Sequence, residues 1–415
     1  MRLAHTADFH IGASGSRLDT ATHLNARMMD RFRCAQFVVQ DAINRGAELI
    51  VHCGDVGNHW HWTPTITRLA KQVFAPALEC GIPVVVLEGN HDQVRNPSEY
   101  DALDLLRDLP GLTVVDKPTL LDVWRAGRDD KLRVTETSSA TQGEAELQLA
   151  GLPYPSANLL LRDEDTRKLG PGDRNLLIRQ KMMDCARGLA ADRVEGVPRV
   201  LLGHWSVDMA TAGTQNRLMM LGGEFTLNAH ELEALGFDAV LLGHIHKPQQ
   251  VLADGQPLIV YSGSPEACSF GEEGEEKRYC LWDIDKQGAE EFHGVPTPFR
   301  KLVTLTASDF QVSDDGSDWE CEPFPDGAIV RLELPPDSPI TVAQALQTIE
   351  EAGAFEARVT KARAETERRR ETDMSHGMAL PEQIDEWLKG RPDYLPHRDA
   401  LVAEALKIEE AVSNG

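Results

Sequence analysis

The sequence predicts a layered α/β fold, with sheets flanked by helices, for roughly the first 300 of its 415 residues. Apolar runs rich in β-branched residues alternate there with helical stretches, which is typical of α/β structure. Four of these runs are continuous, as expected for strands buried on both faces. Each ends at a short polar motif, and ligands of such sheets gather at the carboxyl ends of the strands. The four runs are residues 48–53, 82–87, 199–202 and 237–242.

Other segments of this region complete the predicted layers. Residues 28–45 and 66–79 have helical patterns and fill the gaps between the first strands. Residues 124–143 are polar and charged, so we expect an exposed excursion between strands. The acidic stretch 272–277 is interpreted as the solvated tip of a hairpin.

The pattern changes after about residue 300. Residues 328–334 and 356–362 read as strands on either side of a helix at 341–352, which predicts a small separate α/β domain. A charged segment at 363–372 follows, and its arginines at 368–370 fit a solvated linker better than a DNA contact.

Two short amphipathic helices are predicted at the C-terminal end. Their apolar stripes consist of Leu380, Ile384, Trp387 and Leu388, then of Leu401, Ala405, Ile408 and Val412. We therefore expect four parts: a large domain at 1–298, a small domain at 299–363, a linker at 364–378 and a helix pair at 379–415.

Composition restricts the class of protein. A hydrophobic content of 41% supports a packed core, and no apolar stretch approaches the ~20 residues that span a bilayer. Seven scattered cysteines without a C-x-x-C pair indicate reduced thiols, so we expect a cytoplasmic protein. The net charge of −24 disfavours a generic nucleic-acid binder, because phosphate contacts need Lys and Arg. A DNA substrate would have to be held by metals, by a local basic patch or by a partner chain.

Five short motifs carry the candidate chemistry. They are Asp8-Phe9-His10, Gly54-Asp55, Gly89-Asn90-His91-Asp92, Gly203-His204 and Gly243-His244-Ile245-His246. Residues i and i+2 of an extended segment point to the same side, so the first and last motifs each offer two ligands to one cleft. The glycines allow close backbone approach.

These side chains are of the kinds that hold a pair of divalent metals. A carboxylate bridges two cations readily, and Asp55 is the economical choice for that position. Two metals ~3.5–4 Å apart activate a bridging hydroxide and stabilise an in-line phosphoryl displacement. Mixed imidazole, carboxylate and amide ligands fit Mn²⁺, Fe or Zn²⁺ better than Mg²⁺.

The five motifs resemble those of the calcineurin-like metallophosphoesterase superfamily, and the resemblance covers about residues 1–300. It implies that Asp8, His10, Asp55 and His246 hold one metal, and that Asp55, Asn90, His204 and His244 hold the other. It also implies that His91 stabilises the transition state or protonates the leaving oxygen, with Asp92 orienting it.

Further segments look like those of the SbcD-type nuclease subunits of DNA repair: residues 1–12, 89–95, 151–154, 237–247 and 261–265. This resemblance implies a Mn²⁺-dependent DNA nuclease that acts on duplex ends and on single strands or hairpins. It also implies a capping domain that helps to select DNA, and a helix pair that binds an SbcC-like SMC/ABC ATPase, with a homodimer inside a heterotetramer. Helices that fold back on their own domain are the alternative.

Departures and rival functions remain open. Asn58 stands where nuclease relatives often have histidine, and the adjacent segment 59–62 suits either a DNA-facing loop or buried packing. A small-molecule phosphodiesterase or phosphatase on the same fold is one rival, although it needs neither a capping domain nor an amphipathic tail. A non-catalytic scaffold is the other, although every ligand position is filled. His5, His23, His52 and Cys53 are expected to be structural.

Overall fold

A computed structural model describes residues 1–93, 101–126, 131–137, 145–155, 169–191, 194–211, 225–252, 257–289, 291–313, 318–362, 380–388 and 392–413. The predicted linker and its three arginines lie outside these residues. Within the described ranges, every helix is too short or too polar to cross a bilayer.

The first sheet has six strands. Its order is β15 (Phe292–Pro296), β14 (Arg278–Asp283), β1 (Arg2–Thr6), β2 (Leu49–Cys53), β3 (Val84–Leu87) and β4 (Leu112–Val115). Strands β1 to β4 run parallel, so their carboxyl ends lie on one edge, whereas β14 and β15 are antiparallel additions.

The second sheet has seven strands. Its order is β12 (Gln249–Val251), β13 (Leu258–Tyr261), β11 (Ala239–Gly243), β8 (Arg199–His204), β7 (Leu147–Leu152), β5 (Thr119–Ala126) and β6 (Lys131–Glu136). The middle four strands are parallel, and the outer three are antiparallel. A short parallel pair, β9 (Ser206–Val207) and β10 (Thr226–Leu227), lies apart from both sheets.

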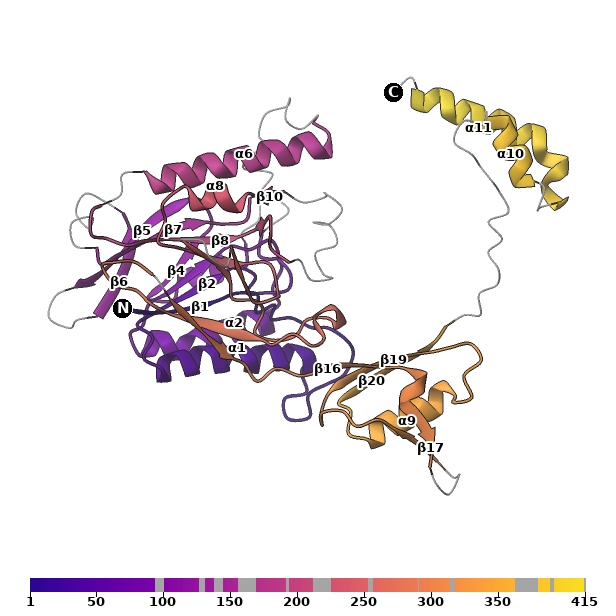
Figure 1. Cartoon of the computed structure of the whole chain (residues 1–415), viewed down its shortest axis with the longest axis horizontal. Coiled ribbons are helices and arrows are strands. Elements are labelled where there is room, and N and C mark those ends of the chain that lie inside the picture. Colours follow the sequence, from indigo (N-terminus) through magenta and orange to yellow (C-terminus); the bar gives the residue numbers. More distant parts are fainter. Residues whose placement is uncertain are drawn as a thin grey trace.

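The two sheets pack face to face between two layers of helices (Figure 1). In β2, Leu49, Val51 and Cys53 face the other sheet, while Ile50 faces the helices on the outer side, as the two-residue period of a strand requires. The outer helices are α1 (Ala26–Asn44) and α2 (Pro64–Glu79) on the first sheet, and α6 (Pro171–Ala190) and α8 (Ala229–Glu233) on the second. A single turn, α3 (Asp104–Arg107), precedes β4. The predicted α/β core of sheets flanked by helices is confirmed.

Local boundaries differ from the predictions for identifiable reasons. Helices α1 and α2 start two residues earlier than expected, because the side chains of Asn25 and Thr63 cap them and Pro64 suits a first turn. The predicted excursion at 124–143 is wrong where it is described. Residues 131–136 form the edge strand β6, whose Lys131 and Arg133 mark an exposed edge rather than a loop.

The small α/β module, as we name residues 302–361, has a three-stranded parallel sheet covered by one helix. Its sheet order is β16 (Leu302–Leu305), β19 (Ile329–Leu334) and β20 (Glu356–Lys361), with α9 (Val342–Glu351) packed on it. The hairpin of β17 (Phe310–Val312) and β18 (Trp319–Cys321) adds to it. The strands and helix expected at 328–334, 341–352 and 356–362 are therefore present.

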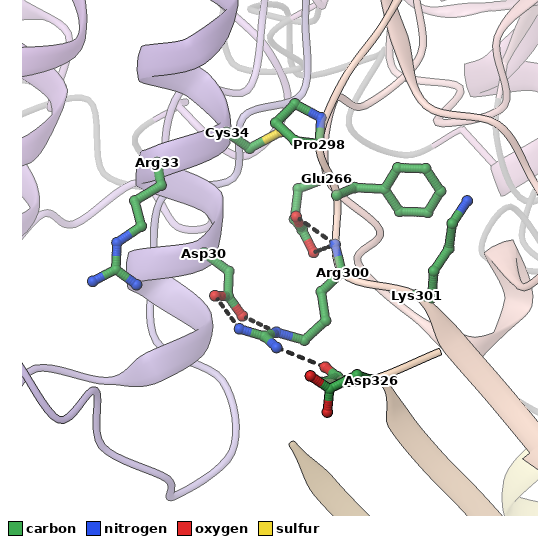
Figure 2. Close-up of a pocket in the computed structure, with 10 residues that line it drawn as sticks. Asp30, Arg33, Cys34, Glu266, Pro298, Arg300, Lys301 and Asp326 are labelled. Carbon is green, nitrogen blue, oxygen red and sulfur yellow. Dashed lines mark hydrogen bonds and ion pairs between the residues drawn. The ribbon is translucent and has the colours of Figure 1, made fainter. Parts of the chain in front are cut away.

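Arg300 joins the module to the large core (Figure 2). Its guanidinium donates to both carboxylate oxygens of Asp30 on α1, at 2.7 and 2.8 Å, and to the carbonyl of Gly327 at 2.7 Å. It also lies 3.6 Å from the ring centroid of Phe355. One side chain thus binds both parts.

The remaining described elements are two 3₁₀ turns and a helical C-terminal segment. Three-residue 3₁₀ helices are η2 (Phe270–Glu272) and η3 (Ala307–Asp309). The C-terminal segment comprises α10 (Leu380–Leu388), η4 (Pro392–His397) and α11 (Arg398–Ser413). Helices α10 and α11 pack on each other (Figure 1). Arg398 donates to Asp385 between them.

Candidate metal centre

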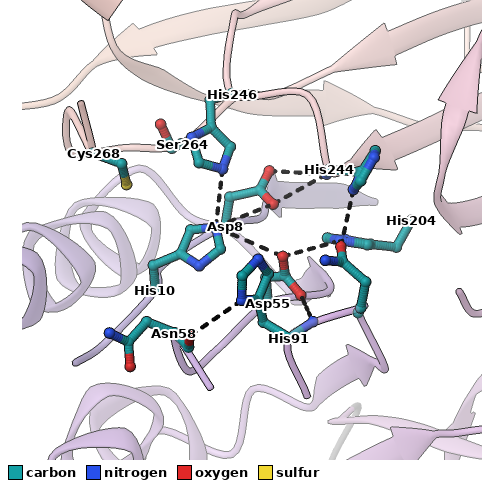
Figure 3. A network of polar contacts seen from close by, with 12 residues as sticks. Asp8, His10, Asp55, Asn58, His91, His204, His244, His246, Ser264 and Cys268 are labelled. Atoms are coloured by element: carbon teal, nitrogen blue, oxygen red, sulfur yellow. Dashed lines mark hydrogen bonds and ion pairs between the residues drawn. The ribbon is translucent and has the colours of Figure 1, made fainter. Parts of the chain in front are cut away.

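The candidate ligands lie where strands of both sheets end. β1, β2 and β3 of the first sheet lead into Asp8, Asp55 and Asn90, and β8 and β11 of the second lead into the three histidines His204, His244 and His246. The predicted site residues, which come from five separate segments, are thus brought together in one place (Figure 3).

The backbone conformation that delivers them differs from the one expected. Asp8, His10, Asp55 and His244 have positive φ angles of 57, 47, 61 and 85°, so the paired ligands do not lie on an extended segment. Non-glycine residues adopt this region at a cost and cluster at functional sites when they do. The convergence of Asp8 with His10 was predicted, but the reason was wrong, because a left-handed backbone produces it.

One group of ligands surrounds the His10 ring. Nε2 of His10 lies 2.9 Å from Nε2 of His246, 3.6 Å from Oδ2 of Asp55 and 4.0 Å from Oδ1 of Asp8. Asp8, His10 and His246 also place one ligand atom each within 4.8 Å of the others. Three of these four side chains are buried, so their lone pairs meet away from bulk water.

A second group surrounds Asn90. Its Oδ1 lies 3.0 Å from Nε2 of His204 and 3.0 Å from Nδ1 of His244. Nε2 of His204 lies 3.2 Å from Oδ2 of Asp55, while its Nδ1 contacts the carbonyl of Cys53 at 2.6 Å. A carbonyl partner fixes the tautomer that leaves Nε2 for the site.

Asp55 therefore belongs to both groups through one oxygen, Oδ2. Close backbone approach makes this possible. A Cβ atom at Gly89 would lie 2.2 Å from Oδ1 of Asp55, and one at Gly54 would lie 2.2 Å from Nδ1 of His204. Any side chain at either glycine would displace a ligand, so the glycines of the motifs serve the geometry directly.

The protonation equilibria show how strongly these groups interact. Burial by itself lowers the pKa of His204, but the Asp55 carboxylate outweighs it and raises that pKa to about 9. Burial also opposes ionisation of Asp55, yet the imidazoles of His204 and His10 hold its pKa well below the usual range. For Asp8, burial prevails and raises the pKa. Such a cluster of buried carboxylates and imidazoles is stabilised by cations.

The donor set fits a pair of transition-metal ions. Carboxylate, imidazole and amide ligands meet in two groups that share one carboxylate, which is the arrangement that a two-metal phosphoesterase requires. Oxygen-only coordination, which Mg²⁺ prefers, is absent from these described groups.

His91 and Asp92 lie beside the ligands, and we expected them to contact each other. Their hydrogen bonds in the described residues go to other groups. Nδ1 of His91 meets the carbonyl of Asn58 at 3.1 Å, and its ring is exposed, edge-on to the ring of His10 at 4.9 Å. The carboxylate of Asp92 is fully buried and accepts from the backbone amides of Asp55, Val56, Gly57 and Gly89. The His91 ring therefore contacts the Asn58 carbonyl, and the Asp92 carboxylate binds the loops that carry Asp55 and Gly89. The role of Asp92 in orienting His91 stays a prediction.

Sequence reasoning missed Glu272 and Lys277. The segment was interpreted as a solvated hairpin tip, but both side chains are buried, with 3% and 0% exposed. Oε1 of Glu272 contacts Nδ1 of His246 at 3.2 Å, and its Oε2 accepts from Nζ of Lys277 at 2.5 Å. Burial opposes ionisation of Glu272, but the bond from His246 and the charge of Lys277 lower its pKa. The acidic composition of the segment concealed this long-range contact.

The neighbouring segments were also interpreted from sequence. In 59–62, Trp62 is buried in the core, as the packing interpretation predicts, whereas His59 and His61 are exposed, and a DNA-facing role for them stays a prediction. His5, His52 and Cys53 are buried, as expected for structural residues. His23 is exposed. All seven cysteines are free thiols.

The family model of calcineurin-like phosphoesterases matches residues 1–248. This chain therefore belongs to the calcineurin-like phosphoesterase family, a family of metal-dependent hydrolases, as the motifs predicted. It is also similar to the SbcD subunit of the nuclease SbcCD from Bacillus subtilis (strain 168), with 30% identity over 302 residues, 70% of this chain and 68% of that protein.

The protein of the same name from Staphylococcus epidermidis (strain ATCC 12228 / FDA PCI 1200) is 22% identical over 74% of this chain and 72% of its own length. Two solved structures align with 71% of this chain and 98% of their own. They are TT1561 of Thermus thermophilus, at 13% identity and a TM-score of 0.37, and a dimetal phosphatase from Danio rerio, at 11% and 0.39.

Proposed function

We propose that this chain is the nuclease subunit of a DNA repair complex and hydrolyses DNA phosphodiesters at a dinuclear metal centre. The observation that carries the proposal is the position of Asp55. Its Oδ2 lies 3.6 Å from Nε2 of His10 and 3.2 Å from Nε2 of His204, between two complete groups of ligands. The similarity to proteins named as the SbcD subunit of the nuclease SbcCD supports DNA as the substrate.

Each group of side chains has an assigned ion in this proposal. Asp8, His10, Asp55 and His246 hold one, and Asp55, Asn90, His204 and His244 hold the other. When bound, two such ions activate a water nucleophile and stabilise charge on the phosphate oxygens. We propose Mn²⁺, because the mixed nitrogen and oxygen donors suit it.

His91 is the proposed proton donor to the leaving sugar oxygen. A carbonyl oxygen only accepts, so Nδ1 of His91 carries a hydrogen when it bonds to Asn58. Nε2 is then the ring atom available to a substrate on the exposed side of the site, and the donating form is the doubly protonated ring, in which Nε2 also carries a hydrogen. The backbone amide of His91 donates to Oδ1 of Asp55 at 2.8 Å, which fixes the position from which the His91 side chain extends.

The remaining parts of the chain are assigned to DNA selection and partner binding. We propose that residues 299–363 form a capping domain and that residues 379–415 bind an SbcC-like SMC/ABC ATPase. In the helix pair, Trp387 packs edge-on against Tyr394 at 5.8 Å, while Tyr394 and Leu406 remain exposed. Exposed apolar side chains on a small helix pair favour a partner. Because the net charge is −24, we assign to that partner much of the basic surface that holds DNA, beside the metals of this chain. The proposed assembly is a homodimer within a heterotetramer.

The test is metal-dependent cleavage by the purified full-length chain. Mn²⁺ is supplied with end-labelled duplex DNA, circular single-stranded DNA or bis-p-nitrophenyl phosphate, with and without an SMC-like ATPase partner. His91→Ala is the matched variant, and its bound metal is counted in parallel. We expect DNA cleavage that falls at least about 100-fold in the variant, as for loss of a general acid, while two ions stay bound.

The other outcomes are decisive as well. Ester turnover without DNA cleavage, with the partner present, would replace the nuclease by a small-molecule phosphodiesterase. Two bound ions with no turnover of any substrate would indicate a scaffold. Full activity in His91→Ala with both ions bound would remove the proton-donor role.

A further inference from the structure

The 3₁₀ turn η2 (Phe270–Glu272) and the residue after it touch two distant parts of the molecule. Glu272 faces the metal centre, whereas Phe270 and Glu273 contact the small α/β module. The proposed hydrolysis does not by itself require adjacent side chains of one turn to contact both the metal centre and the module. The turn therefore forms a physical connection between the module and a metal ligand.

On the metal side, Glu272 fixes the ring of His246. Its Oε1 lies 3.2 Å from Nδ1, the ring atom opposite the Nε2 that faces His10. A carboxylate on the outer nitrogen of a metal-binding histidine sets its tautomer and its orientation. Moving this carboxylate would turn the ligand.

Glu272 is itself held by a fully buried lysine. Nζ of Lys277 donates to Oε2 of Glu272 at 2.5 Å and to the carbonyl of His246 at 3.2 Å. The backbone amide of Cys268 donates to both oxygens of the carboxylate, at 3.3 and 3.2 Å. A buried ion pair with this many hydrogen bonds has a defined geometry, so His246 and the turn move together.

On the other side, the turn is fastened to the module. The carboxylate of Glu273 accepts from the backbone amide of Thr304 at 2.6 Å and from the hydroxyl of the same residue. Arg331 donates to that hydroxyl at 2.9 Å, and its guanidinium lies 4.5 Å from the ring centroid of Phe270. Thr304 belongs to β16 and Arg331 to β19, so the contacts reach two strands of the module's sheet.

We propose that η2 couples the position of the small α/β module to the metal-binding His246. Docking of the module would then set the metal affinity of the ligand group around His10. Glu272 is a positioning residue in this proposal, and Phe270 and Glu273 are the contacts that transmit the module's position. The biological role of this coupling rests on the proposed function, in which the module is the DNA-selecting cap. Movement of the cap would then change the affinity of the metal centre.

The test measures Mn²⁺ binding to the full-length chain by calorimetry, without DNA. Glu272→Gln is expected to weaken one of the two ions about 10–100-fold, as loss of a partner to a ligand does. Phe270→Leu and Glu273→Ala keep Glu272 intact and are expected to weaken the same ion about fivefold or more, the lower range of coupling between sites. Glu320→Ala, at an exposed position of the module, removes the same charge and should bind both ions normally.

A double-mutant cycle shows whether the effect passes through His246. In a His246→Ala background, adding Glu273→Ala should further weaken the ion held by Asp8, His10 and Asp55 by less than about twofold, because the coupled ligand is gone. Thermal unfolding establishes that each variant is folded. If loss of the partner of Lys277 unfolds Glu272→Gln, the variants at Phe270 and Glu273 decide the question.

Three results would overturn the coupling. These are normal binding of both ions in Phe270→Leu and Glu273→Ala, an equal loss of both ions in those variants, or a full Glu273→Ala effect without His246. The titration contains no nucleic acid, so it separates this inference from the proposed function. A wild-type chain that binds two ions but cuts no DNA would refute the nuclease and still leave the coupling measurable.

Discussion

The backbone amide of His91 donates to Oδ1 of Asp55 at 2.8 Å, while Oδ2 of the same carboxylate faces His10 and His204. The proposed proton donor and the shared ligand are therefore fixed to each other by one hydrogen bond. Displacing Asp55 would disturb both the ligand groups and His91. The close packing of Gly89 on Asp55 offers a way to do this without altering a polar side chain.

Gly89→Ala is expected to remove metal binding and activity together. A Cβ atom there would lie 2.2 Å from Oδ1 and 2.4 Å from the backbone nitrogen of Asp55, closer than any real contact. Overpacking of this kind also costs about 1–3 kcal/mol of stability. Bound Mn²⁺ and bis-p-nitrophenyl phosphate turnover are measured, and we expect turnover to fall at least about 100-fold as several kcal/mol of metal stabilisation are lost.

Gly188→Ala is the matched control for that substitution. Gly188 lies in α6 with nothing within 4 Å of its Cβ position, and alanine is favoured over glycine in a helix by about 1 kcal/mol. This variant should retain both ions and unfold no earlier than the wild type. Two ions bound normally by Gly89→Ala would show that Asp55 tolerates displacement.

Acid sensitivity is expected from two fully buried histidines, His5 and His52, whose pKa values burial lowers to about 3. Below pH ~6.5 an unfolded histidine binds a proton that the folded one refuses. The unfolded state then holds more protons, so stability falls as the pH drops from about 6.5 toward 3. Each group contributes up to about 1.4 kcal/mol per pH unit in that window.

His52→Leu tests this dependence. Neither ring nitrogen of His52 has a hydrogen-bond partner among the described residues, so leucine removes the titration without breaking a bond. The free energy of unfolding is measured by urea titration with a chelator between pH 7.5 and 4.5. The slope below pH 6.5 should be shallower than in the wild type, whereas His23→Leu, at an exposed position, should leave it unchanged. Identical slopes in all three proteins would refute the assignment to His52.

The sequence predicted the layers and the strand ends because these depend on local patterns. Continuous apolar runs such as 48–53 indicate buried strands, and a polar motif after each run marks the edge of the sheet at which the ligands lie. The sequence did not predict the backbone conformation of the ligands or the contacts between residues far apart in the chain. The left-handed backbone of Asp8 and His10 has no sequence signal in non-glycine residues, so an extended pair was expected.

Charge composition was misleading for the same physical reason. Glu272 and Lys277 lie in an acidic stretch that reads as solvated, and only the fold brings them to His246, 26 and 31 residues away. The family resemblance implied that Asp92 orients His91. The Asp92 carboxylate accepts from amides near Asp55, a contact that requires the loop geometry.

Asp92→Asn and His91→Ala should therefore affect different properties. The amide of asparagine replaces one acceptor oxygen of a fully buried carboxylate, so backbone donors of the loops lose their partner. Each bond to a charged group contributes about 1.5–3 kcal/mol, and we expect the unfolding free energy to fall by about 2 kcal/mol or more. Denaturant unfolding and metal counting are the measurements. His91 is exposed, so His91→Ala should keep wild-type stability; equal destabilisation by both changes would contradict the separation of roles.

Arg300→Ala is expected to loosen the small α/β module from the large core. The guanidinium binds both oxygens of Asp30 (Figure 2) and the carbonyl of Gly327. It also lies over the face of Phe355, so one truncation removes every one of these contacts. Asp30 is 9% exposed, which makes its loss of a partner costly, at about 2 kcal/mol or more. Hydrogen exchange should increase first in β16, which follows Arg300 directly.

Two further variants serve as controls. Arg300→Lys keeps the charge but loses the bidentate geometry, so its stability should lie between that of the wild type and that of Arg300→Ala. Arg187→Ala, which breaks an exposed pair with Asp184 on α6, should change stability by less than about 1 kcal/mol. Exchange in β16 that stays at the wild-type level in Arg300→Ala would show that the apolar contacts alone hold the module.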